Sequence, residues 1–114
     1  MPRAAPPADA LARLKPRVLA VLGAIPEGRV TTYGTVGRHL RASPRQVARV
    51  LATLTADESA RLPWFRVVAA GGVVSTVKLR AVGRRQVTRL RAEGVAVSTR
   101  NKIEDFRLLL WTPD

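Results

Sequence analysis

The side chains best suited to chemistry in this chain are aromatic and cationic rather than nucleophilic. Trp64 and Phe65 stand side by side in the string Pro63-Trp64-Phe65-Arg66, and Tyr33 follows two threonines further upstream. Rings of this kind can stack on a planar base, at about 1 to 3 kcal/mol for each base. An indole offers no lone pair with which to attack an alkyl carbon. We therefore expect Trp64 to bind rather than to react.

The residues that the chain lacks exclude several kinds of site. It has no cysteine, which excludes a disulfide framework, a thiolate zinc site and a thiol nucleophile. Its single histidine, His39, is expected on a helix face away from Trp64, without a second imidazole or a cysteine beside it. We expect no catalytic residue, no metal ion and no cofactor.

Composition favours one small basic domain. The chain has 114 residues, of which 46% are hydrophobic, enough for a single modest core. Its 20 Lys and Arg against 8 Asp and Glu give a net charge of +12, a balance suited to a polyanion such as nucleic acid. Ribosomal and membrane-surface proteins can be equally basic, so the charge alone does not identify the partner.

The first residues and the apolar stretches of the sequence indicate where in the cell the protein is expected. The given sequence starts without a long apolar run behind basic residues, and its apolar stretches are far shorter than the roughly 18 residues of a membrane span. We expect a monomeric cytoplasmic protein, associated with the nucleoid if its source is prokaryotic. Residues 1–9 are rich in Pro and Ala and are expected to form a disordered tail before a single domain over residues 10–114.

Hydrophobic periodicity predicts the elements that position the aromatic and cationic residues. Apolar residues from Asp9 to Ile25 recur at steps of three and four, which predicts an amphipathic helix. Pro16 interrupts this pattern, so the chain either kinks there or forms two short helices. Residues 30–32 are β-branched and are expected to be extended.

Two short helices joined by a tight turn are predicted next. The first spans about residues 33–40 and the second about residues 44–54, with Ser43 as N-cap and Pro44 at the first helical position. Such a pair makes a helix-turn-helix.

The rest of the chain predicts a wing and a last helix. Residues 65–69 and 73–76 are apolar and separated by Ala70-Gly71-Gly72, which predicts a hairpin. A helix over residues 81–93 should stop at Gly94, and the apolar tail 103–111 should pack back on the domain. The expected fold class is α/β, mostly helical, with a helix-turn-helix and a winged-helix outline.

Three segments at characteristic separations, residues 25–34, 43–48 and 63–68, closely resemble the DNA-binding domain of the O6-alkylguanine-DNA alkyltransferases. The motif of that family is Pro-Cys-His-Arg-Val, and Trp64 stands where the motif has cysteine. The chain therefore resembles the alkyltransferase-like proteins, which bind alkylated guanine without repairing it. The resemblance runs from about Val18 to the C-terminus and includes Arg85-Gln86 and the segment 93–95.

The resemblance implies roles for residues of the helix-turn-helix. Tyr33, between Thr32 and Gly34, would rotate the phosphate beside the target nucleotide at a helix N-terminus whose free amides can hold it. Arg45 would enter the duplex from the minor groove and fill the gap left by the extruded base, although an ordinary helix-turn-helix would use it in the major groove. Ala48 would allow close approach to the backbone. Arg49, like Arg41, is either a phosphate contact or a solvated charge.

The resemblance also implies a pocket for the flipped base. Flipping costs a few kcal/mol, and stacking on Trp64 and Phe65 would offset it; the alternative for Trp64 is a core aromatic under the wing. Arg66 is expected to bond to backbone carbonyls and, with Pro63, to keep the motif in shape. The expected pocket residues are Tyr33, Trp64, Phe65, Val67, Ser75 and Lys78.

Three departures from the family pattern bear on which lesions the protein would prefer. Phe65 replaces the usual His, Ala69 replaces an Asn that ties the recognition helix to this turn, and Val77 stands where some relatives place a lesion-reading Arg. A run of cations is either a solvated face or a contact to the DNA backbone; it comprises Lys78, Arg80, Arg84, Arg85 and Arg89.

These features together predict a protein that binds double-stranded DNA containing O6-alkylguanine, flips the nucleotide and channels the lesion to nucleotide excision repair proteins. The alternative is a winged-helix regulator or nucleoid protein that flips nothing. An enzyme acting on the flipped base by hydrolysis or lyase chemistry would have only the distant Glu93 as general base. The affinity for a duplex with one O6-methylguanine, compared with the unmodified duplex, separates these readings.

Overall fold

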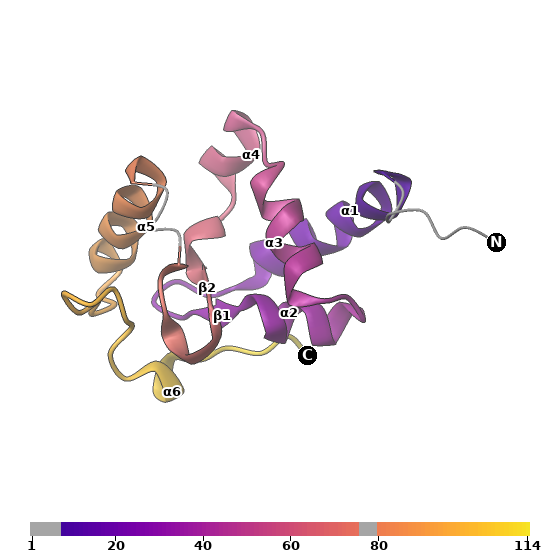
Figure 1. Cartoon of the computed structure of the whole chain (residues 1–114). Coiled ribbons are helices and arrows are strands. Elements are labelled where there is room, and N and C mark those ends of the chain that lie inside the picture. The colour runs from indigo at the N-terminus through magenta and orange to yellow at the C-terminus, as the bar shows by residue number, and fades with distance from the viewer. Residues whose placement is uncertain (1–7, 76–79) are drawn as a thin grey trace.

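Helices lie on both sides of a small parallel sheet in the computed structural model, which describes residues 8–75 and 80–114 (Figure 1). Helix α5 lies on one side of the sheet, and helices α1, α2 and α3 lie on the other. The elements are α1 (Ala8–Ala24), β1 (Thr31–Thr32), α2 (Tyr33–Leu40), α3 (Pro44–Ala52), α4 (Ala56–Arg61), the 3-10 turn η1 (Trp64–Arg66), β2 (Val67–Val68), the 3-10 turn η2 (Ala70–Gly72), α5 (Ala81–Ala92) and α6 (Phe106–Leu109).

Helix α1 continues through Pro16 as one element, so the chain does not form the two separate short helices that the sequence left open. A proline inside a helix costs about 3 kcal/mol, because it removes a hydrogen bond and crowds the preceding turn. Leu14 and Val18, on either side of Pro16, are buried in the same core, and this packing favours the continuous helix. The helix begins at Ala8, inside the segment expected to be disordered, while residues 1–7 lie outside the described part.

The predicted helix-turn-helix is confirmed. Thr32 caps α2 by accepting a hydrogen bond from the Thr35 amide, and Ser43 caps α3 in a reciprocal capping box with Gln46. The turn between the helices is tight, because a Cβ on Gly37 would lie 2.4 Å from the Ala42 carbonyl oxygen. Helix α3 stops at Ala52, two residues before the predicted end.

Helix α4 was not predicted from the sequence. It buries none of its residues, so it has no apolar periodicity to reveal it. Its signal is a capping box, in which Thr55 and Glu58 exchange hydrogen bonds of 2.8 and 3.1 Å. A salt bridge of 3.0 Å between Lys15 and Glu58 ties α4 to α1.

The sheet pairs β1 with β2 in parallel, with Thr31 opposite Val67 and Thr32 opposite Val68. Successive strand residues point to opposite faces. Val67 accordingly packs into the core formed with α1, α2 and α3, and Val68 into the core formed with α5 and the C-terminal segment. The short sheet is therefore the partition between two cores.

The predicted hairpin is confirmed in its turn, but no second strand forms over residues 73–75, and residue 76 lies outside the described part of the chain. One antiparallel bridge, Ala69 to Val73, spans η2, and the chain after it pairs instead with the C-terminal segment. The Gly72 carbonyl accepts from the Ile103 amide, and the Val74 amide donates to the Asn101 carbonyl, both at 2.8 Å. These bonds join the chain after η2 to the C-terminal segment, which becomes its main backbone partner over the described residues.

Helix α5 and the tail agree with the sequence prediction. Gly94, at φ +85°, follows the end of α5, and the buried Gln86 fastens α5 to the Phe65 and Val67 carbonyls at 3.0 and 2.9 Å. The tail returns to β1, where the Trp111 amide donates to the Val30 carbonyl at 2.7 Å. No helix within the described part of the chain is long and apolar enough to cross a membrane.

Candidate nucleic-acid interface

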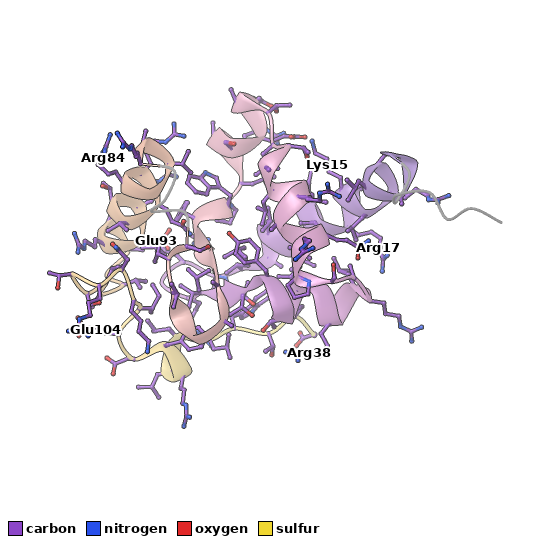
Figure 2. The ribbon with its side chains drawn as sticks, viewed as in Figure 1. Lys15, Arg17, Arg38, Arg84, Glu93 and Glu104 are labelled. Carbon is purple, nitrogen blue, oxygen red and sulfur yellow. The ribbon has the colours of Figure 1, made fainter. Side chains whose placement is uncertain are left out.

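A cleft of about 1150 Å³ opens between α5 on one side and α3 and α4 on the other. Trp64 and Tyr33 lie in its lining, and Figure 2 shows Arg84 on the α5 side. The remaining lining residues are small or apolar on α3 and α4 and largely cationic on α5: Ala48, Leu51, Ala52, Leu54, Ala56, Ser59 and Ala60 face Ala81, Val82, Arg84, Arg85, Thr88 and Arg89.

Trp64 is positioned by the 3-10 turn η1. Its amide donates to the Leu62 carbonyl at 2.9 Å, and its ring meets the Phe65 ring edge to face, with centroids 6.0 Å apart and planes at 89°. The Trp64 side chain is half-buried and lines the cleft, so it does not lie in the core under a wing. Part of the indole is therefore exposed to the cleft.

Phe65 and Val67 were expected to line the pocket, and the structure corrects both. Phe65 is 3% exposed and Val67 is 1% exposed, and each packs into one of the two cores. The expectation failed because the 3-10 turn sends consecutive side chains of the motif in different directions. Phe65 instead supports the site from behind, with Trp64 against it and the guanidinium carbons of Arg89 and Arg66 at 4.5 and 5.3 Å from its ring centroid.

Arg66 holds the motif in place through several bonds. It forms an ion pair with Glu93, in which its Nε lies 2.9 Å from Oε1, and it also donates to the Ile25 carbonyl at 2.8 Å. The backbone bond was expected; the carboxylate partner was not. Pro63 precedes the turn as its N-cap residue and makes no side-chain hydrogen bond.

The Glu93 carboxylate is fully engaged. Burial acts to raise its pKa, but the hydrogen bonds from Arg66 and the Gly28 amide, with the charges of Arg66 and Arg89, outweigh this and hold the pKa below its ordinary value. A carboxylate that is so paired is a poor general base. The enzymatic reading therefore loses the one candidate that the sequence offered it.

Tyr33 begins α2 and lines the cleft with a half-buried ring. Burial raises the pKa of its hydroxyl, against the opposing effect of the side-chain hydrogen bond with Ser75, so the group is neutral at pH 7. Thr32 is buried, and its hydroxyl is bonded to the Thr35 amide and hydroxyl at 3.0 and 2.8 Å. Thr32 thus shapes the helix start, and Gly34 lies beside Pro44.

Helix α3 presents its cations to solvent. Arg45, in the first turn, and Arg49 are exposed and lie outside the cleft lining, whereas Ala48 between them lines it. Arg41 and His39 are exposed near the end of α2, where Figure 2 also labels Arg38. The described residues contain no group of His, Asp or Glu that could hold a metal ion.

Of three further residues named from the sequence, Ser75, Val77 and Lys78, the structure describes one. Lys78 and Val77 lie outside the described residues, whereas Ser75 is described and is half-buried, next to Tyr33 but outside the cleft lining. Sequence reasoning missed the α4 side of the cleft, for which the Thr55 capping box was the available signal.

Comparisons with known proteins show the family to which the chain is similar. Residues 13–95 match the family described as the 6-O-methylguanine DNA methyltransferase DNA-binding domain. The chain is 38% identical, over 85% of its length and 94% of the relative's, to a DNA base-flipping protein of Vibrio parahaemolyticus. It is 45% identical to the DNA base-flipping protein of Escherichia coli, over 77% of this chain and 67% of that one.

A eukaryotic protein and a solved structure are also similar to this chain. The chain is 32% identical to alkyltransferase-like protein 1 of Schizosaccharomyces pombe, over 78% of this chain and 85% of the relative. The crystal structure of that organism's Atl1 in complex with damaged DNA containing O6-carboxymethylguanine matches with a TM-score of 0.76 at 27% identity, covering 90% of this chain and 97% of that one. This chain therefore belongs to the family of the 6-O-methylguanine DNA methyltransferase DNA-binding domain, as an alkyltransferase-like member with Trp64 in the cysteine position.

Proposed function

We propose that this protein recognises O6-alkylguanine in duplex DNA by flipping the nucleotide into the cleft beside Trp64, and that it performs no alkyl transfer. The observation that carries the proposal is the half-buried indole of Trp64 in the lining of a cleft of about 1150 Å³. The chain has no cysteine to accept an alkyl group. The names of its relatives, base-flipping and alkyltransferase-like proteins, support the same activity.

The helix-turn-helix supplies the docking surface in this proposal. Arg45 and Arg49 project from α3 beside Ala48, which lies at the edge of the cleft. Arg45 would fill the vacated stack while Tyr33, at the first turn of α2, would turn the neighbouring phosphate. The net charge of +12 supplies affinity for the duplex that does not depend on the lesion.

The cleft then retains the flipped base. Extrusion costs a few kcal/mol of stacking and pairing, and an aromatic stack on Trp64 returns about 1 to 3 kcal/mol. The small side chains of the opposite wall, such as Ala52, Ala56 and Ala60, leave room for an O6 substituent. By family resemblance, the bound DNA would then pass to nucleotide excision repair proteins.

A direct binding comparison tests the proposal. A duplex with one O6-methylguanine should bind more tightly than the same duplex without it, and 2-aminopurine beside the lesion should gain fluorescence on binding. Equal affinities and unchanged fluorescence would instead favour a DNA-binding regulator that flips nothing.

A further inference from the structure

The two sides of the cleft differ in charge. The wall formed by α3 and α4 contributes alanines, leucines and Ser59, while α5 contributes three guanidinium groups, those of Arg84, Arg85 and Arg89. No acidic side chain lines the cleft within the described part of the chain. A ligand in the cleft therefore meets an apolar surface on one side and a positively charged surface on the other.

Arg85 and Arg89 are four residues apart on α5, so both lie on one face of the helix. Like charges at this spacing repel each other. The described residues form no salt bridge with either side chain, although the charge of Arg89 contributes to lowering the pKa of Glu93. An anion seated in the cleft would relieve this repulsion.

Arg89 packs against the motif that carries Trp64. Its guanidinium carbon lies 4.5 Å from the centroid of the Phe65 ring, and the same ring packs edge to face with Trp64. Because Phe65 is a buried core residue, it gives Arg89 a fixed support without using its N–H donors. Arg84 lies nearer the N-terminal end of α5, away from this support.

From this geometry we propose that Arg89 makes the cleft selective for guanines whose O6 substituent carries a negative charge, such as a carboxymethyl group. The proposal rests on the function proposed above. A base stacked on Trp64 would place its O6 substituent within the same cleft as the Arg89 guanidinium. A planar guanidinium binds a carboxylate through charge-assisted hydrogen bonds, whereas it gains less from a neutral group of the same shape. A backbone phosphate is the other possible anion, and the experiment separates the two.

The experiment compares four duplexes that differ at one guanine: unmodified, O6-methyl, O6-carboxymethyl and O6-carbamoylmethyl, the last being the neutral isostere of the third. Fluorescence anisotropy gives the Kd of each for the wild-type protein, Arg89→Gln and Arg91→Gln at two salt concentrations. Arg91→Gln is the matched control, since Arg91 lies on the same helix but does not line the cleft.

We expect the wild-type protein to bind the carboxymethyl duplex about tenfold more tightly than the carbamoylmethyl duplex, the difference between a charged and a neutral hydrogen-bond pair. Arg89→Gln should bring this ratio close to one and keep the preference for O6-methylguanine over guanine. Arg91→Gln should keep both. Arg89→Lys, which keeps the charge but not the planar stack on Phe65, should retain part of the ratio.

Two outcomes overturn the inference while leaving the proposed function intact. One is a wild-type ratio near one beside a clear preference for O6-methylguanine. The other is an Arg89→Gln variant that weakens all four duplexes alike and lowers their salt dependence, which would assign Arg89 to a backbone phosphate. If no modified duplex is preferred over the unmodified one, both proposals fall.

Discussion

Arg66 and Glu93, 27 residues apart in the chain, form an ion pair that fastens the end of α5 to the turn carrying Trp64. The same carboxylate accepts the Gly28 amide at 3.1 Å, so it also holds the turn before β1. The pair thus joins three segments that are far apart in the sequence. The ion pair therefore has a structural role. It keeps the Glu93 carboxylate ionised and paired at neutral pH, so this group is a poor proton acceptor.

We predict that Glu93→Gln destabilises the protein by about 1 to 3 kcal/mol at pH 7, because a buried guanidinium loses its charged partner. The pKa of Glu93 is lowered in the folded state, so its contribution is present above the unfolded pKa and is lost as the pH falls through the folded pKa. Urea unfolding from pH 7 down to pH 3 measures the difference between variant and wild type. That difference should shrink below about pH 4.5.

Glu104→Gln is the matched control, because Glu104 is exposed and does not contact Arg66. It should leave the unfolding curve almost unchanged. A Glu93 variant as stable as this control would show that the ion pair adds nothing measurable to the free energy of unfolding, as is found for many exposed pairs.

We predict that neither the wild-type protein nor Trp64→Cys removes the alkyl group from O6-methylguanine at an appreciable rate. A thiol at this position must give its proton to a base before it can attack an alkyl carbon. Phe65 offers no proton acceptor, and the Glu93 carboxylate is occupied by Arg66. Mass spectrometry of the protein after incubation with the lesion duplex should show no gain of a methyl group.

Trp64→Cys with Phe65→His supplies the missing imidazole and is the informative companion to the single variant. A methylated Trp64→Cys protein would contradict the argument and would assign thiolate formation to Arg89. Methylation of the wild-type protein would contradict the proposed function itself.

The helical framework could be predicted from the sequence because local signals agreed with packing. Ser43 and Pro44 marked the start of α3, and the buried valines of α3 kept the helical period. Helix α4 was not predicted, because it buries no side chain and its capping box is its only signal in the sequence.

The wing and the pocket could not be derived in the same way. The segment after η2 is apolar and β-branched whichever strand it pairs with, and long-range contacts to Asn101 and Ile103 decided its partner. For the site, the motif predicted the role of Trp64. The 3-10 turn, which directs successive side chains to different sides, buries Phe65 in the core, and the motif did not predict this turn. The cationic α5 wall was visible as a charge run, while its place across from α3 depends on the tertiary fold.

Arg45→Ala should weaken binding to a lesion duplex and reduce the fluorescence gain of 2-aminopurine beside the flipped base. Arg45 is exposed at the first turn of α3, where its guanidinium can enter the gap left by the base. A stacked guanidinium is worth about 0.5 to 2 kcal/mol, which is roughly a two- to thirtyfold change in Kd. Arg49→Ala, one turn further along α3, is the control. Wild-type behaviour of the Arg45 variant beside a defective Arg49 variant would move the intercalating role to Arg49.

Trp64→Ala should lose discrimination for O6-alkylguanine while keeping most of its affinity for plain duplex. Plain binding comes from phosphate neutralisation and falls steeply with salt, whatever the cleft contains. Discrimination requires the extruded base to be held, and the loss of one stack should reduce the preference by about 1 to 3 kcal/mol, roughly five- to 150-fold. Trp111→Ala removes the other indole, which packs against the core away from the cleft, and should leave the preference unchanged once folding is verified by Tm. A folded Trp64→Ala protein with the wild-type preference would show that the cleft holds the base without the indole.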